Sequence, residues 1–293
     1  MWFLSSRRLP PPPAFFVRIL RLQLCAGCLQ LGPTMRLLVT NDDGIDCVFL
    51  RELVLGLRDA GHEISVVAPQ REQSWISAAK SRTRPVRSEM ADRGFGCPTW
   101  IVDGTPSDCV NIALAHLVKS RPDAVVSGMN VGLNASLGFI LASGTVAGAF
   151  EGVLHGLPGI AFSQDLSFEI YDHLKDRGGQ PDEELLGTLK VSAAHAARIV
   201  TELVASTPPE SFIAHNVNFP YPCRPDSARR RTVPARMIIP GLFSPAQDDG
   251  THRFVFHMGQ DRSPAGPLTD RAALAQGFIS HTVLDYTQLG RAP

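Results

Sequence analysis

Short apolar runs alternate with amphipathic segments along most of the chain. Runs of this length, rich in Val, Ile and Leu, are typical of buried parallel strands. The runs that predict strands are 37–39, 64–67, 99–102, 123–127, 159–163 and 215–220. Apolar residues at helical spacing or helix-start residues predict helices over 48–60, 107–118, 144–155 and 185–205. Strands that alternate with helices predict an α/β fold with a Rossmann-like, mostly parallel sheet flanked by helices.

The pattern changes after Pro220. Residues 221–267 are rich in Pro, Gly and Arg, with short β-like pieces at 235–239 and 253–257. A chain of 293 residues is long enough for one large α/β domain with an appendage. We therefore expect an α/β catalytic core at 35–220 and a C-terminal extension at 221–293 that returns to the core.

Composition excludes some classes of protein. The hydrophobic content of 44% and the charged content of 19% are those of an ordinary globular protein. Four of the 28 basic residues fall in 1–34, which holds no acid, so the remainder has 24 basic against 28 acidic residues. A mildly acidic body argues against stable nucleic-acid binding. The six scattered cysteines are interpreted as reduced thiols, which fits a reducing compartment such as the cytoplasm.

The segment Asn41-Asp42-Asp43-Gly44 directly follows the first predicted strand. In open α/β sheets, ligand sites form at the carboxyl ends of strands. Two adjacent carboxylates repel each other there, and a hard divalent cation would relieve that repulsion. Gly44 permits a sharp turn. An Asn/Asp/Gly turn that caps the next helix has the same sequence, so this segment alone leaves both interpretations open.

Further polar groups follow other strand ends. A polar loop, 70–74, comes after the second strand, and 127–134 carries Ser, Gly and Asn after the 123–127 strand. Ser143-Gly144-Thr145 begins a predicted helix, where free N–H groups and the helix dipole bind anions such as phosphate. Because the ends of parallel strands share one rim, we expect these groups to lie together.

Five motifs in this order resemble the SurE survival-protein family of metal-dependent 5′/3′-nucleotidases or acid phosphatases. They are 35–44, 67–69, 104–110, 126–134 and 143–152. The resemblance covers roughly residues 35 to 280. It implies a SurE-like fold whose C-terminal β-hairpin extension builds a homodimer or homotetramer.

The resemblance also implies a set of site residues. The implied ligands of one divalent metal ion, Mg²⁺ or Mn²⁺, are Asp42, Asp43, Ser74 and Asn130. The implied catalytic residues are Asp42 and Asp43, with Asn41 orienting them. The implied phosphate and substrate residues are Ser143, Gly144, Thr145, Asn134 and Gly44. Two segments depart from the family pattern: Gln73 stands where Arg is usual, and the link 135–142 is longer and apolar, which affects substrate preference.

The expected activity is metal-dependent hydrolysis of nucleoside 5′- and 3′-monophosphates, with no membrane partner. Two alternatives stay open, a broad-specificity acid phosphatase and a catalytically weak protein that binds metal or nucleotide. Other classes lack their motifs. Adjacent Asp42-Asp43 does not supply the Asp-x-Asp of a haloacid-dehalogenase-type phosphatase, and the Gly-x-Gly-x-x-Gly of a dinucleotide-binding enzyme and the Gly-x-Ser-x-Gly of a serine hydrolase are absent.

Residues 1–34 form a separate leader with a run of four prolines. Arg18 and Arg21 interrupt its apolar stretch, so no clean transmembrane helix is predicted. The leader could be a start placed upstream of the real one at Met35, a targeting peptide, or an amphipathic arm. We favour the first interpretation because the family-like sequence begins at Met35, and we expect the leader to be disordered and dispensable.

Overall fold

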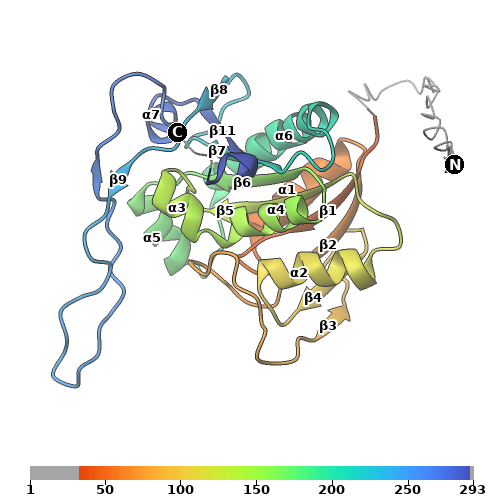
Figure 1. The fold of residues 1–293 in the computed structure, drawn as a ribbon, viewed down its shortest axis with the longest axis horizontal. Coiled ribbons are helices and arrows are strands. Elements are labelled where there is room, and N and C mark those ends of the chain that lie inside the picture. The colour runs from red at the N-terminus through yellow and green to blue at the C-terminus, as the bar shows by residue number, and fades with distance from the viewer. Residues whose placement is uncertain (1–32, 291–293) are drawn as a thin grey trace, which may run out of the picture. The chain divides into compact units, whose positions relative to one another are not determined.

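The structure, a computed structural model, describes residues 33–290. Its centre is a nine-stranded sheet with the strand order β3-β4-β2-β1-β5-β6-β7-β11-β8 (Figure 1). The strands from β4 to β7 run parallel, β3 and β11 pair antiparallel with β4 and β7, and β8 runs parallel to β11. The strand bounds are β1 Arg36–Thr40, β2 Glu63–Pro69, β3 Ser88–Met90, β4 Thr99–Val102, β5 Ala124–Val131, β6 Gly159–Gln164, β7 Ile213–Phe219, β8 Arg229–Thr232 and β11 Ile279–Asp285. The predicted mostly parallel α/β fold is confirmed.

Helices cover both faces of the sheet (Figure 1). Helices α1 (Val48–Asp59) and α6 (Glu183–Ser206) pack together over one face, and α2 (Pro106–Ile112) and α4 (Gly144–Leu154) pack over the other. The first pair encloses the larger apolar core, which includes Phe49, Leu53 and Leu189. Three further helices are α3 (Leu137–Ala142), α5 (Phe168–Asp176) and α7 (Asp270–Ala275).

Helix α4 lies unusually close to the sheet because glycines face it. A Cβ atom at Gly152 would lie 2.5 Å from Cγ2 of Val125, and one at Gly148 would lie 2.8 Å from Oγ of Ser127. Real side-chain carbons do not approach their neighbours so closely. The glycines therefore let the N-terminus of α4 reach the ends of the central strands.

The strand order reverses between β1 and β5. From β1 the chain builds outward through β2 and β4, whereas from β5 it builds the other way through β6 and β7. Ligands in open α/β sheets bind at such a switch point, outside the carboxyl ends of the strands. The Asn41–Gly44 segment after β1 and the end of β5 therefore lie where a site is expected.

Some predicted elements were wrong in detail. The β-like piece at 253–257 forms no strand, and only an isolated bridge joins Phe254 to Phe243. The short strand β9 (Met237–Ile238) pairs instead with β10 (Gln260–Asp261). The helix expected over 107–118 is α-helical only to Ile112, and a π-helical turn continues it. Helices α3 and α5 were not predicted, because six and nine residues give little periodicity.

The C-terminal part joins the sheet through β8 and β11. Between β9 and β10 the chain extends from the body as a long loop, residues 239–259, which we call the arm (Figure 1). The expectations for residues 1–32 lie outside the described residues. Across residues 33–290, no helix has both the length and the apolar character needed to cross a membrane.

Candidate active site

A tight turn after β1 places the two carboxylates. Gly44 has a φ of +95°, which glycine adopts without strain, and Asn41 Nδ2 donates to the Gly44 carbonyl at 2.9 Å. The Ile45 N–H then donates to the carbonyl of Pro69 at the end of β2. Asn41 is fully buried and shapes this turn, whereas Asp42 and Asp43 line a cavity.

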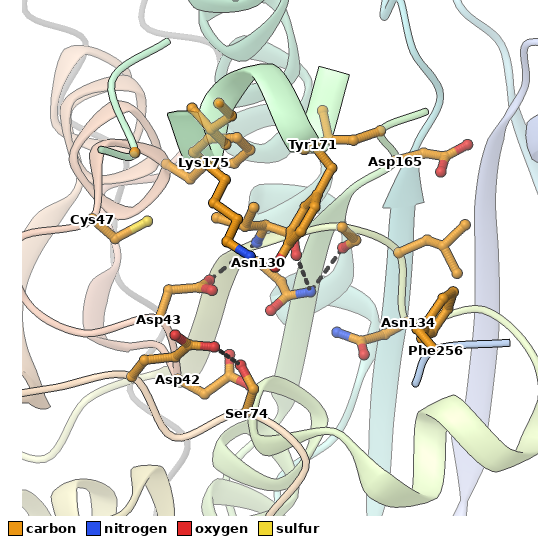
Figure 2. Close-up of a pocket in the computed structure, with 18 of the residues that line it drawn as sticks. Asp42, Asp43, Cys47, Ser74, Asn130, Asn134, Asp165, Tyr171, Lys175 and Phe256 are labelled. Carbon is orange, nitrogen blue, oxygen red and sulfur yellow. Dashed lines mark hydrogen bonds between the residues drawn. The ribbon is translucent and has the colours of Figure 1, made fainter. Parts of the chain in front are cut away.

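A bulge in β5 directs Asn130 toward the carboxylates. The pairing of β5 with β6 shifts between Ser127 and Asn130. Gly128 lies there with a φ of +126°, and a Cβ atom would meet the Phe162 carbonyl oxygen at 2.2 Å. Bulges re-aim side chains beside functional sites. Asn130 therefore lies within β5, whereas the sequence had indicated a position after the strand. Its side chain enters the pocket (Figure 2).

Hydrogen bonds hold these three side chains in place. The Thr145 hydroxyl lies within hydrogen-bonding distance of both Asp42 Oδ1 and Asn130 Oδ1, the second at 3.0 Å. Asn130 Nδ2 donates to the Gly132 carbonyl at 2.7 Å, and Asp43 Oδ2 accepts from the Val131 N–H at 3.0 Å (Figure 2). The donors and acceptors are therefore fixed by the fold.

Burial disfavours the charged forms of both carboxylates. Burial raises the pKa of Asp42 to about 6, although the Thr145 hydroxyl lowers it in part. Burial, and then the Asp42 carboxylate beside it, raise the pKa of Asp43 well above its usual range. Within the described part of the chain, no group of three or more His, Cys, Asp or Glu side chains is placed to hold a metal. The oxygen donors here are the carboxylates of Asp42 and Asp43, the amide of Asn130 and the hydroxyl of Ser74. All four are hard oxygen ligands, which fit Mg²⁺ or Mn²⁺.

The N-terminus of α4 faces Asp42. Ser143 caps the helix by accepting from the Val146 N–H at 3.1 Å. The Thr145 backbone N–H and hydroxyl both lower the pKa of Asp42, and a Cβ atom at Gly144 would lie 2.8 Å from Asp42 Cβ. Of the segment 143–145, expected to bind phosphate, Ser143 lines the cavity, while Gly144 and Thr145 are buried against Asp42.

Ser74 and Asn134 lie on the cavity wall as well. The Ser74 hydroxyl donates to Glu72 at 2.7 Å, and the Gln73 N–H donates to the Asp42 carbonyl at 2.7 Å. Asn134 is buried, with Nδ2 donating to the Ser163 hydroxyl at 2.9 Å. Both residues are thus near the carboxylates but already have protein partners.

The cavity has a volume of about 1310 Å³ and includes residues that sequence reasoning missed. Tyr171 and Lys175 reach into it from α5 (Figure 2). Trp75, Phe139 and Phe256 also line it. Trp75 and Phe139 lie in segments 73–77 and 135–142, whose departure from the family pattern could have indicated them. Helix α5 and the arm match no motif.

An open α/β sheet with polar groups at its switch point is typical of α/β proteins that bind a ligand outside the carboxyl ends of the strands. The chain belongs to the SurE family: the family model described as Survival protein SurE matches residues 37–237. A relative from Solidesulfovibrio magneticus, named 5'-nucleotidase SurE, is 35% identical over 86% of this chain and 92% of its own length.

Two further comparisons agree. A 5'-nucleotidase SurE from Nostoc sp. is 40% identical, and the match spans 64% of this chain and 64% of the relative. The crystal structure of SurE protein from Aquifex aeolicus has a TM-score of 0.65 and 27% identity, covering 85% of this chain and 93% of that one. The fold and the family are thus established independently.

Proposed function

We propose that the chain is a divalent-metal-dependent phosphomonoesterase that hydrolyses nucleoside 5′-monophosphates, and 3′-monophosphates as well, to nucleoside and phosphate. The observation that carries the proposal is the meeting of Asp42, Asp43 and Asn130 at one end of a large cavity. The relatives' name, 5'-nucleotidase SurE, supports the same reaction.

Asp42, Asp43 and Asn130, with Ser74, would hold one Mg²⁺ or Mn²⁺ ion. When bound, such an ion supplies Lewis-acid polarisation of a phosphoryl oxygen and lowers the pKa of water. A cation would also favour the charged forms of the two carboxylates, whose pKa values burial raises, and would offset the effect of the Asp42 charge on Asp43. The donor set supports a hard cation rather than a soft one, because it contains no thiolate or imidazole.

The chain's own residues position the reacting groups. Thr145 holds Asp42, the Val131 N–H holds Asp43, and the Gly132 carbonyl holds the Asn130 amide. These bonds exist before any substrate arrives, so little reorganisation is required during the reaction. Ser143, at the N-terminus of α4, gives the phosphoryl group a site where the helix dipole favours negative charge.

In the proposed hydrolysis, a water oxygen bonds to phosphorus and the ester P–O bond breaks. The leaving oxygen takes up the proton that the attacking water loses and becomes the nucleoside hydroxyl. Asp43 is our assignment for the group that accepts the proton of the water, because its Oδ2 is held by Val131 while the carboxylate lines the cavity.

Substitution Asp43→Asn tests the proposal, because it removes one charge and keeps the shape. We expect phosphate release from AMP to fall by at least roughly 100-fold, since even outer partners of a metal are typically worth 10–100-fold. The matched control is Asp59→Asn, at the exposed end of α1. A folded Asp43→Asn protein with metal-dependent turnover equal to that of the control would contradict the assignment.

We further propose that residues 35–220 form the catalytic core and that residues 221–293 serve assembly into a homodimer or homotetramer. Apolar side chains on β9 and the arm support this. Ile238 and Phe243 are both exposed, and an exposed apolar patch is typical of a contact site between chains.

A further inference from the structure

Five aromatic rings from four separate segments meet beside the carboxylates. Phe139 lies 5.6 Å from Trp75 and 5.6 Å from Phe256, measured between ring centroids. Phe254 lies 5.2 Å from Trp75, and Phe168 lies 5.9 Å from Phe256. We call these five residues the aromatic cluster. Trp75 follows β2, Phe139 is in α3, Phe168 is in α5, and the other two are in the arm.

The cluster is not an ordinary piece of core. Phe139 is 5% exposed, but Trp75, Phe168, Phe254 and Phe256 are 42%, 56%, 48% and 38% exposed. Most of the contacts join ring edges to ring faces, at interplanar angles of 61° to 77°, as aromatic pairs commonly do. The exposed fractions of the four rings show that aromatic surface stays uncovered in spite of these contacts.

All five rings line the same cavity as Asp42 and Asp43. Trp75 directly follows Ser74, and Phe139 lies four residues before Ser143. The Ser77 N–H donates to the Ala142 carbonyl at 3.0 Å and so fixes the Trp75 loop to α3. The cluster and the two carboxylates therefore share one cavity, with Trp75 next to Ser74 in the chain.

The loop that presents Trp75 has a costly backbone. Trp75 and Ser77 have φ values of 63° and 53°, the left-handed region that non-glycine residues rarely adopt. Such conformations persist only where the surroundings enforce them, and they concentrate at ligand sites. Here the enforced conformation directs a tryptophan ring to the cavity wall.

We propose that the aromatic cluster binds the leaving group of the substrate and selects phosphomonoesters whose leaving group carries a planar aromatic base. This inference rests on the proposed function and adds its specificity-determining residues. A base stacks on an aromatic face whatever its hydrogen-bonding pattern, so the cluster favours a nucleobase without choosing among bases.

The size of the cavity agrees with a large leaving group. Its volume of about 1310 Å³ exceeds the roughly 300–1,000 Å³ typical of sites that enclose a drug-sized ligand. A metal ion and a phosphate would occupy a small part of it. The remaining space would accommodate a nucleoside that extends from its phosphate.

The test compares AMP with ribose 5-phosphate, which share the phosphate and the sugar and differ only in the base. We expect wild-type full-length protein to prefer AMP by at least about tenfold in kcat/KM, since stacking of one base is worth roughly 5- to 150-fold. Trp75→Leu and Phe256→Leu, each of which keeps apolar bulk but removes a ring, should lower this ratio by about tenfold.

Phe212→Leu is the matched control, because Phe212 is 45% exposed and does not line the cavity. It should leave the ratio unchanged. Equal kcat/KM for the two substrates in the wild type, or equal losses on both substrates in the two cluster variants, would show that the rings only support the arm. Absence of phosphate release from either substrate would instead count against the proposed function itself. Competitive inhibition of ribose 5-phosphate hydrolysis by adenosine, but not by ribose, gives a second readout should one variant fail to fold.

Discussion

Substitution Gly144→Ala probes how closely the N-terminus of α4 must approach Asp42. The added methyl would lie 2.8 Å from Asp42 Cβ, 2.9 Å from Asp42 Oδ2 and 3.0 Å from the Gln73 carbonyl oxygen. An ordinary van der Waals contact begins at 3.4 Å, so Asp42 and the helix must separate by about 0.6 Å. Gly144 does not have a positive φ, so any effect of the substitution comes from crowding by the added methyl group.

Two free-energy terms oppose each other in this variant. Alanine is preferred over glycine in helices by up to about 1 kcal/mol, less so at the first position. Overpacking a filled site costs about 1–3 kcal/mol. We therefore expect a net loss of unfolding free energy of about 1 kcal/mol. The loss of activity should be far larger, because functional groups need positioning within about 0.5 Å and a 1 Å misplacement can cost about 100-fold.

The assay is kcat/KM for AMP at saturating Mg²⁺ or Mn²⁺, together with unfolding by urea. Gly187→Ala in α6 is the matched control, because a Cβ atom there meets nothing within 4 Å. It should stabilise the fold by about 0.5–1 kcal/mol and leave kcat/KM unchanged. Wild-type kcat/KM in folded Gly144→Ala would refute the reasoning, since Asp42 would then tolerate displacement.

Two further predictions concern pH and assembly. His215 and His281 are buried with Nδ1 and Nε2 at 3.0 Å, and burial lowers their pKa values to about 4 and about 3. Because the unfolded chain takes up these protons first, the pair should leave the unfolding free energy unchanged above about pH 7.5. For His215 alone, that free energy should fall by about 2–3 kcal/mol as pH drops to about 4.5. Urea unfolding should show a shallower pH dependence in His281→Leu, and an unchanged one would contradict this. Light scattering on the full chain should give a dimer or tetramer that Phe243→Ser weakens, and a monomeric wild type would count against assembly through the arm.

The sequence predicted the residues near the chain's strand ends well, because parallel topology brings those ends together. Asp42 and Asp43 lie within three residues of the end of β1, and Ser143 caps the N-terminus of α4. The position of Asn130 could not be predicted from the sequence. Only the structure shows that β5 continues past the bulge at Gly128 and includes Asn130. The role of Thr145 was also hidden, because a helix start that binds phosphate and one that holds a carboxylate have the same sequence.

The aromatic cluster could not be predicted from sequence order. Trp75 and Phe254 lie far apart in the chain and meet only because part of the arm returns to the cavity wall. Helix α5 was missed for a different reason: it is short and buries only Leu174, so its apolar periodicity is weak. Chain segments that close a site from outside the sheet carry little of the periodic signal on which such predictions depend.

The most direct test of the central claim is phosphate release from AMP by the full-length chain, measured with Mg²⁺, with Mn²⁺ and with a chelator. The account predicts release with either ion, no release with the chelator, and recovery when the ion is restored. Release that persists at full rate in the chelator, or a folded protein that binds Mn²⁺ without releasing phosphate under any of these conditions, would contradict a metal-dependent phosphomonoesterase at Asp42, Asp43 and Asn130.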